Sequence, residues 1–72
     1  MNNLNVAKIQ LNGDLYEINT GTNLDKLLNK LKIKENKVAI EVNGEIIEKS
    51  KYSNLILGKE DKVEIVHFIG GG

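Results

Sequence analysis

The last ten residues of the chain read Val63-Glu64-Ile65-Val66-His67-Phe68-Ile69-Gly70-Gly71-Gly72. Successive side chains of a strand point to opposite faces, so this run presents Val63 and Ile65 to one face and Val66 and Phe68 to the other. A strand that is apolar on both faces is expected in the centre of its sheet, or it presents one face to a partner. The run therefore predicts a sheet whose last strand leads directly into glycines.

The three final glycines are the candidate functional site. A glycine has no β-carbon, so a glycine tail passes through a channel that rejects bulkier residues. Three extended residues reach about 10 Å at ~3.3–3.6 Å each, which is enough to place a terminal carboxylate in the active site of another protein. The alternative is a frayed or added end, as is common at chain termini. We treat residues 70–72 as a flexible tail on a single domain of residues 1–72.

Two Asn-Gly pairs upstream indicate two hairpins. Residues 6–18 read as a pair of antiparallel strands joined at Asn12-Gly13, because both positions of such a turn favour a positive φ. Residues 38–42 alternate between apolar and other side chains, and Asn43-Gly44 follows them. Residues 45–48 are expected to form a short return strand.

One amphipathic helix is predicted between the hairpins. Thr22 is expected to be its N-cap, with Asp25 in the first turn, where a negative charge suits the helix dipole. The apolar positions follow the i, i+3, i+4, i+7 spacing of one helix face and are Leu24, Leu27, Leu28 and Leu31. This face is expected to lie on the sheet.

The order of elements is hairpin, helix, strand pair, loop and strand. It predicts an α+β fold of the ubiquitin-like β-grasp type, with a mixed four- to five-stranded sheet and one main helix packed across it. Residues 49–62 are expected to form a loop with a helical turn, pinned by Tyr52, Leu55 and Leu57. With 72 residues, folding buries only about 60% of the surface of the unfolded chain, which leaves little room for a deep catalytic pocket.

The composition argues against several classes of function. The chain has no cysteine, and therefore no disulfide and no thiolate nucleophile or metal ligand. Its ten basic residues are all lysines and balance ten acidic ones, and three residues are aromatic, which argues against nucleic acid as the main partner. No apolar run approaches the roughly 20 residues that cross a membrane, and the start lacks a signal-peptide pattern. We therefore expect a cytoplasmic protein that makes no membrane contact.

Residues that could act as catalytic groups or metal ligands are not clustered in the sequence. The single histidine, His67, has no nucleophile to pair with and is interpreted as structural. The acidic side chains are scattered over strands and turns as a solvated face, so neither a metal site nor a bound cofactor is predicted. A group of lysines is interpreted as the solvent face of the helix and the connection after it, in preference to a docking patch: Lys26, Lys30, Lys32, Lys34 and Lys37.

A family pattern covers nearly the whole chain after the first five residues. Its segments are residues 9–13, 24–28, 38–47, 49–50 and 61–72. They resemble the ThiS family, the small β-grasp sulfur carriers of thiamine biosynthesis. The most specific parts are the Val-Asn-Gly-Glu-Ile-Ile turn region and the strand that runs into the terminal glycines. Where family members often carry proline and arginine after that turn, this chain has Glu48 and Lys49.

The resemblance implies a carrier protein with no catalytic residue of its own. Family members are adenylated on the terminal glycine by an ATP-dependent activating enzyme, ThiF, which uses Mg-ATP. The glycine is then converted to a thiocarboxylate, and the thiazole synthase ThiG takes its sulfur to build the thiazole ring of thiamine. By match of motif, Gly72 is the modified residue, and Gly70 and Gly71 are the slender approach to it. The free carrier is expected to be a monomer.

Val66, Phe68 and Ile69 are the candidate residues for partner contact. They form an apolar patch at the base of the tail for a ThiF-like or ThiG-like enzyme, or they pack under the helix or the adjoining loop, and periodicity leaves both alternatives open. Other functions that fit the pattern are the MoaD-like small subunit of molybdopterin synthase, a β-grasp protein-interaction module and a ubiquitin-like modifier joined to lysines. The short length and the Val-Glu-Ile-Val-His-Phe-Ile approach favour the thiamine carrier.

Overall fold

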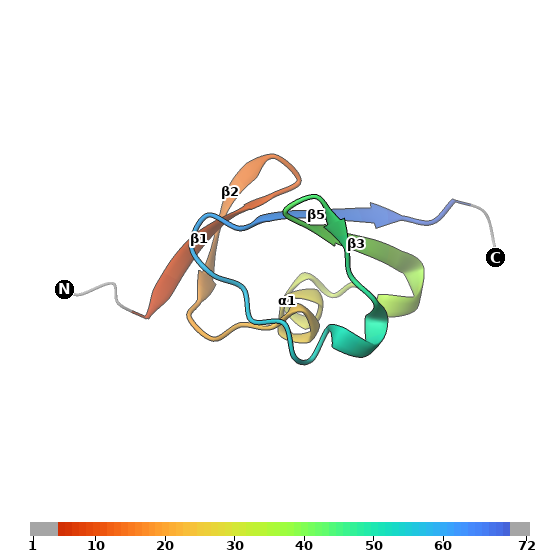
Figure 1. The fold of residues 1–72 in the computed structure, drawn as a ribbon, viewed down its shortest axis with the longest axis horizontal. Helices are drawn as coiled ribbons and strands as arrows, with labels where there is room; N and C mark the ends of the chain where they lie inside the picture. The colour runs from red at the N-terminus through yellow and green to blue at the C-terminus, as the bar shows by residue number, and fades with distance from the viewer. Residues whose placement is uncertain (1–4, 70–72) are drawn as a thin grey trace.

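The fold is one sheet with a helix packed across one of its faces. A computed structural model of the chain describes residues 5–69. The strands are β1 (Val6–Leu11), β2 (Asp14–Asn19), β3 (Val38–Val42), β4 (Glu45–Ile46) and β5 (Lys62–His67). The helix α1 (Leu24–Leu31) crosses under them, and two short 3-10 helices, η1 (Glu35–Lys37) and η2 (Lys49–Lys51), lie in the connections (Figure 1).

The last strand, β5, lies in the centre of the sheet. The strand order is β2-β1-β5-β3-β4, with β5 parallel to β1 and antiparallel to β3. This five-stranded mixed sheet with its single α-helix confirms the α+β prediction and the central place of the final strand. The return strand β4 is shorter than the predicted residues 45–48, because Glu48 already turns the chain into η2 and its carbonyl accepts a hydrogen bond from the Lys51 N–H at 2.9 Å.

Both predicted Asn-Gly hairpin turns are confirmed. Asn12 and Gly13 have φ angles of 50° and 89°, and Asn43 and Gly44 have φ angles of 52° and 86°. Two successive positive φ angles define the turn that matches the right-handed twist of the flanking strands. The turns set the register in which Leu11 pairs with Asp14 in the first hairpin.

The core lies between the sheet and α1. From α1, the core includes the buried side chains of Leu24, Leu27 and Leu28, and Leu31 is partly buried at the edge of the core. This confirms the predicted leucine face of the helix. The sheet contributes Ile9, Ile18, Val38, Ile40, Val42, Val63 and Ile65, and the loop after η2 contributes Tyr52 and Leu57.

The predicted N-cap of α1 is wrong by one residue. Asn23 caps the helix, because its side-chain oxygen accepts a hydrogen bond from the Lys26 N–H at 2.7 Å. The hydroxyl of Thr22 instead donates to the carbonyl of Asn19 at 2.6 Å and closes the turn before the helix. Asp25 lies in the first turn, as predicted.

The lysines of the helix and the connection after it are all exposed, as a solvent face requires, and the preference for a solvent face over a docking patch stays a prediction. Lys30 also covers the outer edge of the sheet. Its ammonium donates a hydrogen bond to the carbonyl of Glu17 on β2 at 3.3 Å and lies 5.1 Å from the centre of the Tyr16 ring. A lysine at an edge strand disfavours pairing with a further chain.

Within residues 5–69, no helix is long and apolar enough to cross a membrane, since α1 has eight residues.

Candidate functional site at the base of the tail

The beginning of β5 is held from both sides by the two Asn-Gly turns. On one side, the Asn12 N–H donates to the carbonyl of Val63 at 2.9 Å, and the Asn12 side-chain oxygen accepts from the Ile65 N–H at 2.8 Å. On the other side, the Asn43 N–H donates to the carbonyl of Lys62 at 2.7 Å, and its side-chain oxygen accepts from the Lys62 N–H at 2.9 Å. The strand that carries the tail is therefore fixed by backbone and side-chain bonds where it begins.

Asp61 links this region to the preceding turn. One of its carboxylate oxygens accepts a hydrogen bond from the Gly58 N–H at 2.8 Å, and the other accepts one from the Asn43 side-chain amide at 3.0 Å. The Asp61 N–H donates to the carbonyl of Gly58 at 3.1 Å, which closes a turn over residues 58–61. One carboxylate thus joins the turn before β5 to the turn after β3.

The end of β5 is bonded on one side, to β3 and to the residue before it. Val38, the first residue of β3, pairs with His67, and the Phe68 N–H donates to the carbonyl of Lys37 at 2.9 Å. The side chain of the following residue, Ile69, is 100% exposed. Within the described residues, Phe68 is therefore the last one that makes a backbone hydrogen bond to the body.

The three candidate contact residues form what we call the tail-base patch: Val66, Phe68 and Ile69. Val66 is 58% exposed and Phe68 is 57% exposed, so the alternative that they pack under the helix does not hold. Val63 and Ile65 take that place, because they are the β5 side chains buried against the core. Contact of the tail-base patch with a partner stays a prediction, and Gly70, Gly71 and Gly72 lie outside the described residues.

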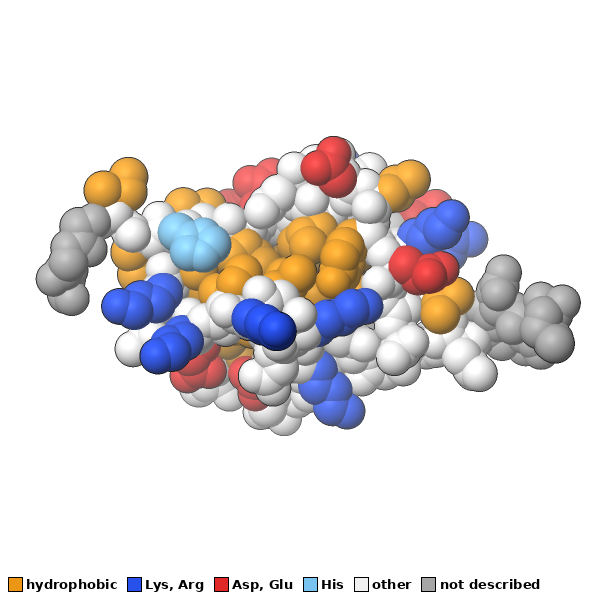
Figure 2. Space-filling view, turned by 180° about the vertical axis from the view of Figure 1, so that it is seen from behind, with side chains coloured by type: hydrophobic (Ala, Val, Ile, Leu, Met, Phe, Trp, Pro, Cys, Tyr) orange, Lys and Arg blue, Asp and Glu red, His pale blue; other side chains and the backbone are white. Residues whose placement is uncertain are grey.

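Charged side chains surround apolar ones on the face seen from behind in Figure 2. His67 is exposed, and the buried side chains of the described residues are all hydrophobic ones, among which Tyr52 carries a hydroxyl. Nor do residues 5–69 hold a group of three or more histidine, aspartate or glutamate side chains placed to bind a metal ion. Burial raises the pKa of the Tyr52 hydroxyl, an effect opposed by its hydrogen bond with the backbone of Ile40.

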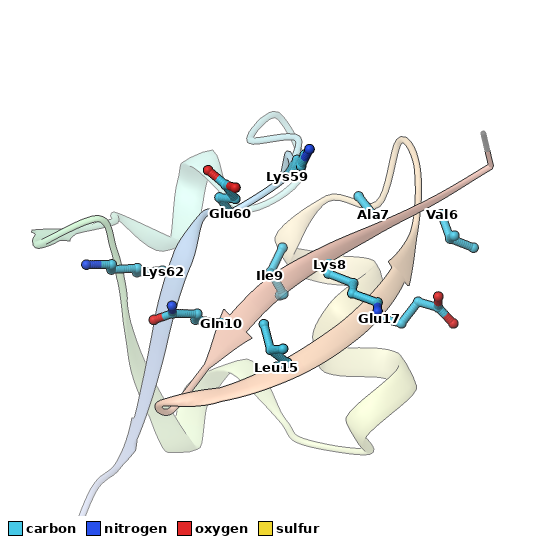
Figure 3. A pocket seen from close by; sticks show the side chains of 10 residues that line it. All are labelled: Val6, Ala7, Lys8, Ile9, Gln10, Leu15, Glu17, Lys59, Glu60 and Lys62. Carbon is cyan, nitrogen blue, oxygen red and sulfur yellow. The ribbon is translucent and has the colours of Figure 1, made fainter. Parts of the chain in front are cut away.

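A hollow of about 660 Å³ lies at the other end of β5 (Figure 3). Lys8, Glu17, Lys59 and Glu60 contribute charged side chains to its lining, together with the exposed Leu15. This hollow was not predicted from the sequence, because it forms only where the first hairpin meets the turn before β5. Its position separates it from the tail-base patch by the length of the strand.

Lys49 contacts the tail-base patch, which the sequence did not predict. The Lys49 ammonium lies 5.5 Å from the centre of the Phe68 ring and 3.5 Å from the carbonyl oxygen of Val38. The two residues are far apart in the sequence and meet because β5 pairs with β3. No local pattern indicates this contact.

A mixed sheet that holds one helix, with a central last strand that leads into glycines, defines a ubiquitin-like β-grasp protein. The sequence model of the ThiS family matches residues 9–72, and the chain belongs to this family.

Relatives of known name agree with this assignment. The sulfur carrier protein ThiS of Bacillus subtilis is 42% identical over 66 residues, which are 89% of this chain and 98% of that protein. A crystal structure of the thiamine biosynthesis protein ThiS from Geobacter metallireducens superposes with a TM-score of 0.79 at 29% identity and covers 90% of this chain and 99% of that one.

A thiazole synthase of Magnetococcus marinus contains a related segment. It is 42% identical over 65 residues, which are 90% of this chain but 20% of that protein. The chain therefore spans a fifth of the length of this relative.

Proposed function

We propose that the chain is a sulfur carrier of thiamine biosynthesis and that the carboxylate of Gly72 carries the sulfur as a thiocarboxylate. The observation that supports this most directly is the end of β5. The Phe68 N–H makes a hydrogen bond to the carbonyl of Lys37, and the next side chain, Ile69, is fully exposed. The last described side chain before the glycines thus faces solvent, which supports delivery of the tail to another protein.

A carboxylate needs activation before sulfur displaces one of its oxygens, because a free carboxylate is a poor electrophile. In the proposed first step, a carboxylate oxygen of Gly72 attacks the α-phosphorus of ATP and pyrophosphate leaves. A sulfur nucleophile that comes ultimately from cysteine then attacks the carbonyl carbon, and AMP leaves with the oxygen. A ThiF-like adenylating enzyme supplies the Mg-ATP and the catalytic groups. This chain is its protein substrate, and Gly70 and Gly71 allow the narrow approach.

The proposed acceptor of the sulfur is a ThiG-like thiazole synthase. The relative from Magnetococcus marinus supports this partner, because a protein named thiazole synthase includes a segment similar to 90% of this chain. We infer that the tail-base patch makes the body contacts with both enzymes, since its exposed apolar side chains are next to the tail.

Intact-mass spectrometry tests the proposal. The untreated chain first establishes that Gly72 is the last residue. After incubation with the activating enzyme, ATP and a sulfur source, the mass should rise by the difference between one sulfur and one oxygen, and fragmentation should place the change on Gly72. An unchanged mass with an enzyme that is active on its own carrier would contradict the proposal.

Deletion of Gly71 and Gly72 provides the matched control. We expect the shortened chain to keep its thermal stability, because a terminal tail makes few stabilising contacts, and to lose sulfur transfer. Full transfer by the shortened chain would instead support a protein-interaction module. A strain that lacks the gene should require thiamine or its thiazole part, whereas loss of the molybdenum cofactor would identify a molybdopterin synthase subunit.

A further inference from the structure

Lys49 contacts two elements at the point where the tail leaves the body. Its ammonium lies 5.5 Å from the centre of the Phe68 ring, within the range of a cation–π interaction. The same ammonium donates a long hydrogen bond of 3.5 Å to the carbonyl of Val38, the first residue of β3. One side chain therefore contacts both Phe68 and the first residue of β3, the strand that pairs with β5.

The backbone of Lys49 is itself fixed to the core. The Tyr52 N–H donates to the carbonyl of Lys49 at 3.1 Å, and the Tyr52 side chain is buried. The Lys51 N–H donates to the carbonyl of Glu48 at 2.9 Å, which closes the turn of η2 around Lys49. The ammonium thus reaches Phe68 from a rigid base.

The contact with Lys49 bears on the tail, because Phe68 directly precedes Ile69 and the glycines in the sequence. The Phe68 N–H is bonded to Lys37, but the Phe68 ring is 57% exposed, and the bond alone leaves the ring free to change rotamer. The ammonium over the ring restricts that motion at the residue that precedes Ile69 and the glycines in the sequence. A partner that binds an already ordered ring loses less conformational entropy on association.

We propose that Lys49 is a positioning residue for the tail: it holds the Phe68 ring near the first residue of β3 and so presents the tail-base patch in the form that the activating enzyme binds. This inference rests on the proposed function, which supplies the enzyme. The interaction acts before any chemical step, so it affects binding of the carrier and not the turnover of the bound complex.

Proton NMR of the free chain tests the contact without any enzyme. A methylene group beside the face of an aromatic ring is shifted upfield, so the ε-protons of Lys49 should resonate upfield of those of Lys51, an exposed lysine of the same 3-10 helix. Phe68→Leu should abolish the difference. Equal shifts of the two lysines in the unchanged chain would overturn the proposal.

The kinetics of adenylation test the positioning role with matched variants. Lys49→Ala and Lys49→Met should raise the KM for the carrier by about two- to fivefold and leave kcat unchanged, the range expected for loss of an exposed cation–π contact. Lys49→Arg should restore the original KM, because a guanidinium also stacks on rings. Lys51→Ala should behave like the unchanged chain.

The outcomes separate this inference from the proposed function. A Lys49→Ala variant with the KM of Lys51→Ala, or a normal KM in Lys49→Met, would overturn the role of the ammonium. If the unchanged chain is never adenylated, the proposed function fails and the positioning role fails with it, whereas the NMR shifts still report whether the contact forms.

Discussion

The side-chain oxygen of Asn12 accepts a hydrogen bond from the backbone N–H of Ile65 at 2.8 Å and ties the first turn of the chain to its last strand. The β1 ladder ends one residue earlier, where Leu11 pairs with Val63. The amide of Asn12 continues that ladder after the backbone has turned away. Asparagine suits this position for two reasons. Its side chain accepts the hydrogen bond from Ile65, and its backbone tolerates the φ of 50° better than that of most residues.

Asn12→Gly should lower the free energy of unfolding by about 1 kcal/mol, because it removes the acceptor of a partly buried N–H. Glycine accepts the positive φ, so backbone strain does not contribute to the loss. Asn12→Asp keeps an acceptor oxygen and should retain most of the stability. Urea denaturation at neutral pH measures both variants, and equal losses would show that the bond to Ile65 contributes little.

Asn43→Asp should also destabilise the chain, by electrostatic repulsion. The Asn43 amide donates to a carboxylate oxygen of Asp61 at 3.0 Å, and the substitution replaces that donor with a second carboxylate. Two like charges near 4 Å repel by about 1 kcal/mol in water. The double variant Asn43→Asp with Asp61→Asn should recover this loss. A penalty of the same size in the Asp61→Asn background would contradict the explanation.

The elements predicted correctly depend on local patterns. The Asn-Gly pairs dictate two turns, and the leucine spacing of α1 identifies its buried face. The N-cap could not be decided locally, since Thr22 and Asn23 are both good caps. Asn23 takes the position while its side-chain amide also donates to the carbonyl of Ser53 at 3.1 Å, a partner 30 residues away.

The candidate site was only partly predictable for the same reason. The alternation of β5 identifies two apolar faces but does not say which one the helix covers, and only the packing assigns Ile65 to the core and Val66 to the surface. The contact of Lys49 with Phe68 depends on the pairing of β3 with β5, which no short sequence pattern encodes.

Tyr52 should make stability fall at alkaline pH. Burial raises its pKa above the ordinary value of about 10, so the folded chain keeps a proton that the unfolded chain loses. The stabilisation is complete below pH 10 and is lost as the pH rises from there through the folded pKa. Thermal melts between pH 8 and 11 should show a shallower alkaline fall for Tyr52→Phe than for the unchanged chain. Tyr16→Phe, at a less buried tyrosine, is the control, and a change in slope of the same size there would contradict this assignment.

Ile69→Ser should weaken binding to the activating enzyme and leave the stability of the fold unchanged. Ile69 is 100% exposed, so its replacement should leave the free energy of unfolding within about 0.5 kcal/mol of its original value. If the tail-base patch is buried against the activating enzyme, loss of one isoleucine removes about 1.5–3 kcal/mol of transfer free energy. The KM for adenylation should then rise at least about tenfold, since 1.4 kcal/mol corresponds to a factor of ten. Ile56→Ser is the matched control, because Ile56 is 55% exposed and pairs with Asn23 beside the start of α1, away from the tail. A rise in KM shared by both variants would indicate a general effect of surface polarity and would remove the support for docking at the tail base.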